Sequence, residues 1–351
     1  MRASCLRAVA VSPSGLASRA RRRPRGRSSS RAHRVAPRAA GSADAADDDA
    51  SFEGELLANI AASLDGKLRT LRVGVKDSRG SPARMNNRNA TSGTLFRSPC
   101  WLDAYVDPGQ HVVLVDRDTQ KSVRKPISVS PYKARATVPD SDMSVIEILL
   151  DSDSDDGDEN FFAAQMPPPS KGAPTYAVSA VRGGGFENPL FAEYTLRSAL
   201  ERGHALVVCA GGARGMGPAR AVMESPEVLA HADTHPVTLF YLRAGEKASN
   251  GASAAYVGEW SEWREGGAGV VPCYGAFFDD GVFAVQSAIA GGAQGGGKHE
   301  SVLGADAGKV TVLLAGLERE ETEALLNVFA NLRGVPREQI LVLPGFGPKK
   351  K

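Results

Sequence analysis

The second half of the chain alternates short apolar runs with stretches that carry a helical spacing of apolar residues. The runs lie at 205–210, 237–242, 270–274, 310–315 and 340–343. Uninterrupted apolar runs of this length are typical of strands buried on both faces of a parallel sheet. The stretches between them predict helices at 191–201, 253–264, 282–290 and 318–332. Strands separated by helices imply right-handed crossovers, so the pattern predicts a doubly wound parallel sheet in an α/β domain.

The first half follows a different pattern, in which short strands are separated by turn signals. Alternating or apolar runs predict strands at 71–75, 109–115, 125–130, 144–150 and 175–181. Such a series is typical of an antiparallel sheet or a small barrel. The spacing of apolar residues at 52–64 predicts a short amphipathic helix. We therefore expect two domains, an antiparallel β-barrel domain over 45–189 followed by the α/β domain over 190–347.

The acidic run at 151–160, DSDSDDGDEN, interrupts the strand pattern of the first domain. It has a likeness to a calcium loop, but no Glu closes a loop of the required length, so the spacing does not favour a metal site. The proline-rich stretch 166–174 continues the same excursion. We expect a solvated insertion between strands over 151–174.

A glycine turn follows the first strand of the α/β domain. Gly211, Gly212 and Gly215 come directly after the run 205–210 and permit a tight turn and a close approach of backbone to a ligand. Pro218 is expected in the first turn of the helix that follows. A strand, a glycine turn and a helix start together aim free N–H groups at an anionic group such as a pyrophosphate. The alternative interpretation is a glycine-rich turn that binds nothing.

Charge is unevenly distributed along the chain. The 351 residues carry a formal net charge of +2, but residues 1–43 contain many Arg and no Asp or Glu. A head rich in Arg, Ser and Ala and poor in acids is typical of an organelle transit peptide. We expect residues 1–44 to be a disordered transit peptide of a chloroplast, with a mitochondrion as the alternative; a basic arm that binds RNA or membrane is the other interpretation. Because the remainder is net acidic, the total charge does not indicate a nucleic-acid partner.

The remaining features argue against several other classes of protein. No run approaches the roughly 20 apolar residues of a membrane-spanning helix, so no transmembrane segment is expected. The cysteines are scattered without metal or redox spacing, and Cys209 and Cys273 lie in apolar runs, which predicts buried thiols. The glycine-rich run at 292–299 resembles a Walker A loop but has His299 where Ser or Thr would hold Mg²⁺. No Ser/His/Asp or Cys/His set emerges, so a hydrolase has no support.

Several short motifs in order along 109–343 resemble those of one family. The motifs are GQ at 109–110, KPIS at 125–128, GGGF at 183–186, GGARGMGP at 211–218, FYLR at 240–243 and LAG at 314–316. Together they resemble the ferredoxin–NADP reductase superfamily, and in particular the plant FAD/NAD(P)-binding oxidoreductases of the fruit-protein type. The resemblance implies a flavin-binding barrel followed by a domain that binds NADP or NAD. It also implies a flavin-dependent oxidoreductase that transfers electrons between NAD(P)H and an unidentified acceptor.

The flavin part of the resemblance rests on 125–128. These residues, Lys125, Pro126, Ile127 and Ser128, match the family motif R-x-Y-S, and Lys125 and Ser128 are expected to bind FAD phosphate. Ile127 replaces the Tyr that stacks on the flavin ring, and Lys125 keeps the charge of the family's Arg but loses its bidentate geometry. The aromatic residue that covers the flavin in the family is replaced by Leu343-Pro344. These departures weaken the prediction of FAD.

The nucleotide part of the resemblance rests on the second domain. The pyrophosphate is expected at the turn that contains Gly211, Gly212, Gly215, Met216 and Pro218. Arg243 and Lys247 are predicted to bind a 2′-phosphate, which would favour NADPH. Tyr256 is predicted to contact the adenosine end, and Gly316 the nicotinamide.

Two hypotheses about function follow from these residues. The first is an organellar flavin-dependent NAD(P)H oxidoreductase, which the retained order of the glycine turns favours. The second is a non-catalytic relative that keeps the scaffold and serves as a nucleotide-binding or interaction protein. The replacement of the family's Tyr by Ile127, and of the Cys in its C-G-P turn by Ala315, favours the second hypothesis. No catalytic residue and no metal ligand is assigned.

Overall fold

The computed structural model describes most of the chain after residue 51. The described residues are 52–76, 101–136, 143–167, 175–188, 190–244, 251–275, 282–287, 297–298 and 306–343. All of them belong to one compact unit, Asp48–Lys351. The predicted transit segment, Lys247 and most of the Walker-like run lie outside the described residues.

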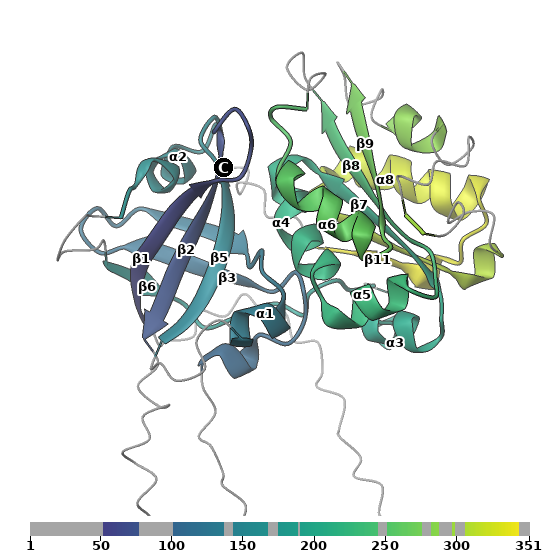
Figure 1. Cartoon of the computed structure of the whole chain (residues 1–351), viewed down its shortest axis with the longest axis horizontal. Coiled ribbons are helices and arrows are strands. Elements are labelled where there is room, and N and C mark those ends of the chain that lie inside the picture. The colour runs from purple at the N-terminus through teal and green to yellow at the C-terminus, as the bar shows by residue number, and fades with distance from the viewer. Residues whose placement is uncertain are drawn as a thin grey trace, which may run out of the picture. The chain divides into compact units, whose positions relative to one another are not determined.

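The first domain is a six-stranded antiparallel sheet that closes into a barrel (Figure 1). The strands run in the order β4-β3-β6-β1-β2-β5, where β1 is Phe52–Ala61, β2 Leu68–Lys76, β3 His111–Asp116, β4 Ser122–Pro126, β5 Met143–Asp151 and β6 Thr175–Val178. Closure comes from a bridge between Ile127 and Ile148, with the Ser128 N–H donating to the Glu147 carbonyl at 2.8 Å. The predicted antiparallel barrel is confirmed.

The first strand corrects one prediction. Residues 52–61, predicted as part of a helix, form β1, which pairs with β2 along one edge and with β6 along the other. The prediction was wrong because spacing over a short window does not separate a helix from a strand that contains an irregularity. Here the register shifts between Leu56 and Ala58, which breaks the alternation that a regular strand would show.

The acidic segment corrects another prediction. It connects β5 with β6, but its second half is a helix, α2 (Gly157–Ala164), and not a solvated loop. Asp156 caps this helix by accepting from the Asp158 N–H, and carboxylates in the first turn favour a helix N-terminus. Phe162 is fully buried in the barrel core. The acidic run therefore serves as a helix start that is held to the barrel by an aromatic anchor.

The second domain is a five-stranded parallel sheet with the order β11-β10-β7-β8-β9. The strands are β7 (Ala205–Gly211), β8 (Val237–Ala244), β9 (Gly269–Gly275), β10 (Val310–Ala315) and β11 (Ile340–Val342). Every run predicted as a strand in this half falls on one of them. Cys209 on β7 and Cys273 on β9 are buried free thiols, as predicted.

Helices cover both faces of the parallel sheet. One apolar cluster joins the sheet to α3 (Leu196–Glu201), α4 (Gly212–Met223), α5 (Pro226–Ala232) and α6 (Trp260–Glu265). A second cluster, on the other side of the strands, includes α8 (Arg319–Leu326) and its π-helical continuation Asn327–Leu332. The predicted doubly wound arrangement is confirmed.

Shorter helical segments complete the described chain. They are η2 (Trp101–Ala104), α1 (Pro131–Ala136), η4 (Val257–Glu259), η5 (Ala307–Lys309) and η7 (Arg337–Gln339), together with a helical turn at 282–287. No helix among the described residues is both long and apolar enough to span a bilayer.

The burial of α2 against the barrel gives a stability prediction. Phe162→Ala should lower the free energy of unfolding by about 3–5 kcal/mol, because it empties a fully buried aromatic site. Phe161→Ala, next to it and only partly buried, is the matched control and should cost less than half as much. Urea denaturation measures both. Equal small losses would mean that α2 does not belong to the core.

Candidate functional site

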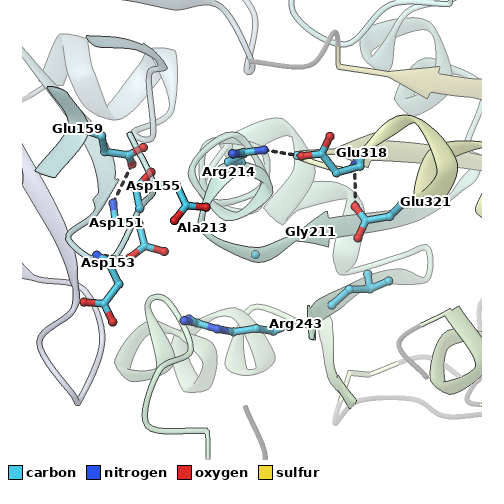
Figure 2. A pocket seen from close by; sticks show the side chains of 14 residues that line it. Asp151, Asp153, Asp155, Glu159, Gly211, Ala213, Arg214, Arg243, Glu318 and Glu321 are labelled. Carbon is cyan, nitrogen blue, oxygen red and sulfur yellow. Dashed lines mark hydrogen bonds and ion pairs between the residues drawn. The ribbon is translucent and has the colours of Figure 1, made fainter. Parts of the chain in front are cut away.

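A cleft of about 360 Å³ opens where strands of the parallel sheet end (Figure 2). Its lining comes from both domains: Asp151, Asp153, Ser154, Asp155 and Glu159 from the end of β5 and from α2, and Gly211, Gly212, Ala213, Arg214, Leu242, Arg243, Gly316, Glu318 and Glu321 from the α/β domain. Ligands of open parallel sheets lie beyond the carboxyl ends of the strands, so this cleft is in the expected place. We refer to it as the dinucleotide cleft, after the ligand that the sequence resemblance predicts there.

The start of α4 forms one wall of the dinucleotide cleft. Gly211 is the N-cap and supplies no capping side chain, so the first N–H groups of the helix have no side-chain acceptor there. Gly212 has a φ of +53° and no neighbouring heavy atom within 4 Å of the position that a Cβ would take. The turn is therefore open, and exposed amides at a helix N-terminus suit a negatively charged group.

The other predicted turn residues have a packing role. A Cβ at Gly215 would overlap the Ala315 carbonyl oxygen, and one at Gly316, whose φ is +66°, would overlap the backbone of Gly215. These two glycines let α4 lie directly against the end of β10. Met216 is fully buried in the core. Pro218 lies inside α4, which begins at Gly212, so its predicted place in the first helical turn was wrong.

Carboxylates dominate the lining of the dinucleotide cleft. Six lining residues are Asp or Glu, whereas Arg214 and Arg243 carry the guanidinium groups. Arg214 is bonded to Glu318 at 2.5 Å, and Arg243 donates to the Ser253 carbonyl. Burial raises the pKa of Glu321, whose side chain accepts from the Glu318 N–H at 2.6 Å. Arg243 thus lines the cleft, in acidic surroundings that sequence reasoning did not anticipate, and its predicted contact with a 2′-phosphate stays a prediction.

The residues of the predicted flavin motif lie inside the barrel wall. Lys125 Nζ is 2.5 Å from Glu159 Oε1, and both side chains are largely buried. Pro126 is buried, and Ile127 and Ser128 have no exposed surface. Ile127 belongs to the barrel core. The motif therefore closes the barrel, and its side chains present no free face to a ligand in this arrangement.

Neighbouring segments cover the same place. A Cβ added to Gly217 of α4 would lie 3.4 Å from the Ser128 Cβ and 3.6 Å from the Leu149 Cβ, so the helix backbone rests on the barrel. Leu343, at the position of the family's covering aromatic residue, is buried. A Cβ at Gly109 would lie 2.7 Å from Leu343 Cδ1. The domains pack directly on each other here.

Tyr256 lies away from the dinucleotide cleft. It lines a second groove, of about 370 Å³, together with Thr70, Arg72 and Arg220. The Arg220 guanidinium carbon is 4.6 Å from the centre of the Tyr256 ring, and the Thr70 hydroxyl donates to the Tyr256 hydroxyl at 3.2 Å. Burial raises the pKa of Tyr256 to about 12. The structure therefore does not bring Tyr256 together with Gly211, Gly212 and Arg243.

Sequence reasoning missed Arg220. Its only signal is a single charged residue within the otherwise apolar second half of α4. Its partners lie on separate segments of the chain, so spacing along the sequence does not reveal them.

Comparisons with known proteins identify the fold. No protein-family model matches the chain, and no curated protein sequence does. A mutant of ferredoxin–NADP⁺ reductase from Plasmodium falciparum superposes with a TM-score of 0.53 at 11% identity, covering 83% of this chain and 95% of that one. Ferredoxin–NADP⁺ reductase from Neisseria gonorrhoeae with bound FAD and NADP gives 0.50 at 12%, covering 83% and 97%. A cytochrome P450 reductase from Amycolatopsis gives 0.52 at 15%, covering 85% and 70%.

These similarities establish an architecture. The chain has the two-domain fold of the ferredoxin–NADP⁺ reductases, with the antiparallel barrel first and the parallel α/β sheet second. The resemblance stated from the sequence motifs is confirmed at this level. A shared fold does not establish that this chain has the activities or the ligands of the similar proteins.

The close approach of α4 to β10 gives a second prediction. Gly215→Ala should lower the free energy of unfolding by about 2–3 kcal/mol, because its methyl group would overlap the Ala315 carbonyl. Gly258→Ala is the control, since no neighbouring atom lies within 4 Å of its added Cβ. Chemical denaturation measures both variants. An unchanged stability of Gly215→Ala would contradict the described contact.

Proposed function

We propose that this protein is an oxidoreductase that binds a pyridine nucleotide in the dinucleotide cleft. The observation that carries the proposal is the turn at Gly211 and Gly212, which ends β7, is open at Gly212 and brings the first residues of α4 to the lining of the cleft. The order of the two domains and their fold support it. So does the similar structure from Neisseria gonorrhoeae, which contains FAD and NADP.

Different residues of the cleft would contact different parts of the nucleotide. The first-turn amides of α4 would bind the pyrophosphate, since a helix N-terminus attracts negative charge. Arg243, on the neighbouring strand β8, supplies a positive charge at the cleft lining. Gly316 follows β10 and lines the cleft, but its missing side chain makes room for the backbone of Gly215 and not for a ligand. Hydride transfer asks the protein mainly for positioning, so this assignment needs no acid–base residue.

FAD is the electron carrier that the resemblance implies, and when bound it would accept a hydride from the nucleotide. The predicted contacts do not fit it in the described arrangement. The Lys125 ammonium is already bonded to Glu159, and Ile127 and Ser128 are completely buried. We therefore derive no step through a flavin, and FAD binding stays a prediction supported by the fold.

A second candidate function is a nucleotide-binding protein of this fold that works without a flavin. The specific observation that favours it is the direct packing of α4 and Leu343 on the barrel, where the resemblance places the flavin. A nucleotide-binding protein of this kind needs no electron acceptor. The oxidoreductase, in contrast, needs an acceptor, which is unidentified.

The visible absorption spectrum separates the two candidates. Protein lacking residues 1–44 would be purified with FAD present during lysis and then titrated with NADH and NADPH. Flavin bands that bleach on addition of either nucleotide are the result expected of the oxidoreductase. A colourless protein whose tryptophan fluorescence is quenched on addition of nucleotide would support the flavin-free candidate. Binding of neither ligand would contradict both.

We also propose delivery to a chloroplast, with a mitochondrion as the alternative. The support is the Arg-rich, acid-free composition of residues 1–43. A fusion of residues 1–44 to a fluorescent protein should enter plastids in a plant or algal cell. A fusion that stays in the cytosol would contradict the proposal.

A further inference from the structure

Arg220 is a buried cation at the contact between the two domains. Its side chain is 7% exposed and has three carboxylate partners within 3.2 Å: Glu147 Oε2 at 2.5 Å, Glu259 Oε2 at 2.7 Å and Glu224 Oε1 at 3.2 Å. Glu147 lies on β5 of the barrel, whereas Glu224 and Glu259 belong to the α/β domain. The guanidinium group therefore joins the domains, and we refer to these four residues as the Arg220 cluster.

The charges of the Arg220 cluster depend on one another. Burial alone raises the pKa of Glu147, but its bonds to Arg220 and to Arg72 outweigh burial and leave that pKa below its ordinary value. The ordinary consequence of such pairing is that neither partner is easily removed, because the remaining charge stays buried without compensation. The bond between Arg220 and Glu147 is thus a specific link between α4 and β5, in addition to apolar packing.

The same two elements form facing walls of the dinucleotide cleft. The α4 helix begins there at Gly212, eight residues before Arg220, which is about 12 Å along a helix. Strand β5 ends there at Asp151, four residues after Glu147, which is about 13 Å along a strand. The Arg220 cluster therefore holds one end of the contact between α4 and β5, and the cleft lies at the other end.

Between these ends the contact between α4 and β5 is apolar. Gly217 lies over Leu149 and Ser128 without a side chain of its own, and Met216 belongs to the same buried cluster as Leu149. Lys125 pairs with Glu159 within the barrel wall. At the opposite wall of the cleft, Arg214 pairs with Glu318 (Figure 2). A polar link between α4 and β5 is supplied at the far end, by Arg220.

We propose that Arg220 is a positioning residue for the dinucleotide cleft: its bond to Glu147 fixes α4 relative to β5, and so sets the separation of the walls that receive the nucleotide. The inference rests on the proposed function. A displacement of about 1 Å caused by a distant residue can lower a reaction rate about 100-fold, and we expect the contacts to a nucleotide to weaken for the same reason. Arg220 itself is not among the residues that line the dinucleotide cleft.

The test compares variants that cut different bonds of the cluster. Glu147→Gln and Arg220→Lys weaken the link between α4 and β5. Arg72→Gln is the matched control, because Arg72 bonds the same Glu147 carboxylate at 2.6 and 3.0 Å but lies on the barrel. Isothermal titration calorimetry of the full chain with NADH and with NADPH gives the dissociation constant and the stoichiometry separately, and calorimetric scans give Tm.

The inference expects a particular pattern. When measured at a temperature well below Tm, Glu147→Gln and Arg220→Lys should raise the dissociation constant at least about tenfold. The stoichiometry should be unchanged. Arg72→Gln should stay within about twofold of the wild type. Either role lowers Tm, because the remaining charge stays buried. A purely structural role would leave the dissociation constant unchanged, which would overturn the inference. If Arg220→Lys does not fold, the milder Glu147→Gln decides.

The outcome also separates this inference from the proposed function. A wild type that binds neither NADH nor NADPH would overturn both. A wild type that binds a nucleotide, together with a Glu147→Gln variant that binds it equally well, would overturn only the role of Arg220.

Discussion

The buried guanidinium of Arg220 is a charged constraint on the contact between the two domains. An isolated charge with 7% exposure would be strongly unfavourable, so the fold must bring carboxylates to it from both sides. Glu147 comes from the barrel, and Glu224 and Glu259 come from the α/β domain. Removal of one partner of such a group typically costs about 3–5 kcal/mol, because the other charge stays buried. The domain contact is therefore specific as well as apolar.

The contact between α4 and the barrel determines which of the two predicted ligand sites is accessible. Because α4 lies flat on β5 and Ser128, the barrel wall at 125–128 is covered. Because the same helix begins at an uncapped glycine turn, its N-terminus faces the dinucleotide cleft. One helix thus separates a covered barrel surface, where the resemblance expects a flavin, from an open cleft, where it expects a pyridine nucleotide. The fold is shared with flavin-containing reductases, but the side chains at the two places differ in accessibility.

Most of the strands could be predicted from the sequence, because apolar runs and turn signals act locally. Predictions failed where a local signal was ambiguous or hidden. The spacing at 52–64 fitted a helix, but pairing with β2 and β6 along both edges made it a strand. The acidic run concealed the cap of α2, and only tertiary packing of Phe162 shows that the helix belongs to the core.

The candidate site was partly predictable for the same reason. The turn at Gly211 and Gly212 is a local motif, and the structure places it at the cleft. The acidic lining was not predictable, because Asp151 and Glu159 come from the other domain. Arg220 was not predictable either, since its role depends on Glu147 and Glu259, which are 73 and 39 positions away. Residue-level assignments such as Tyr256 depended on a resemblance and not on local chemistry.

Hydrogen exchange of the backbone amides, with and without nucleotide, tests the central claim most directly, because it reports where a pyridine nucleotide binds. Saturating NADH or NADPH should slow exchange at 211–214, at the start of α4, and leave 127–128 in the barrel wall unchanged. Protection at 127–128 without protection at 211–214 would contradict the account. So would a nucleotide that binds, as measured by calorimetry, without slowing exchange at the dinucleotide cleft.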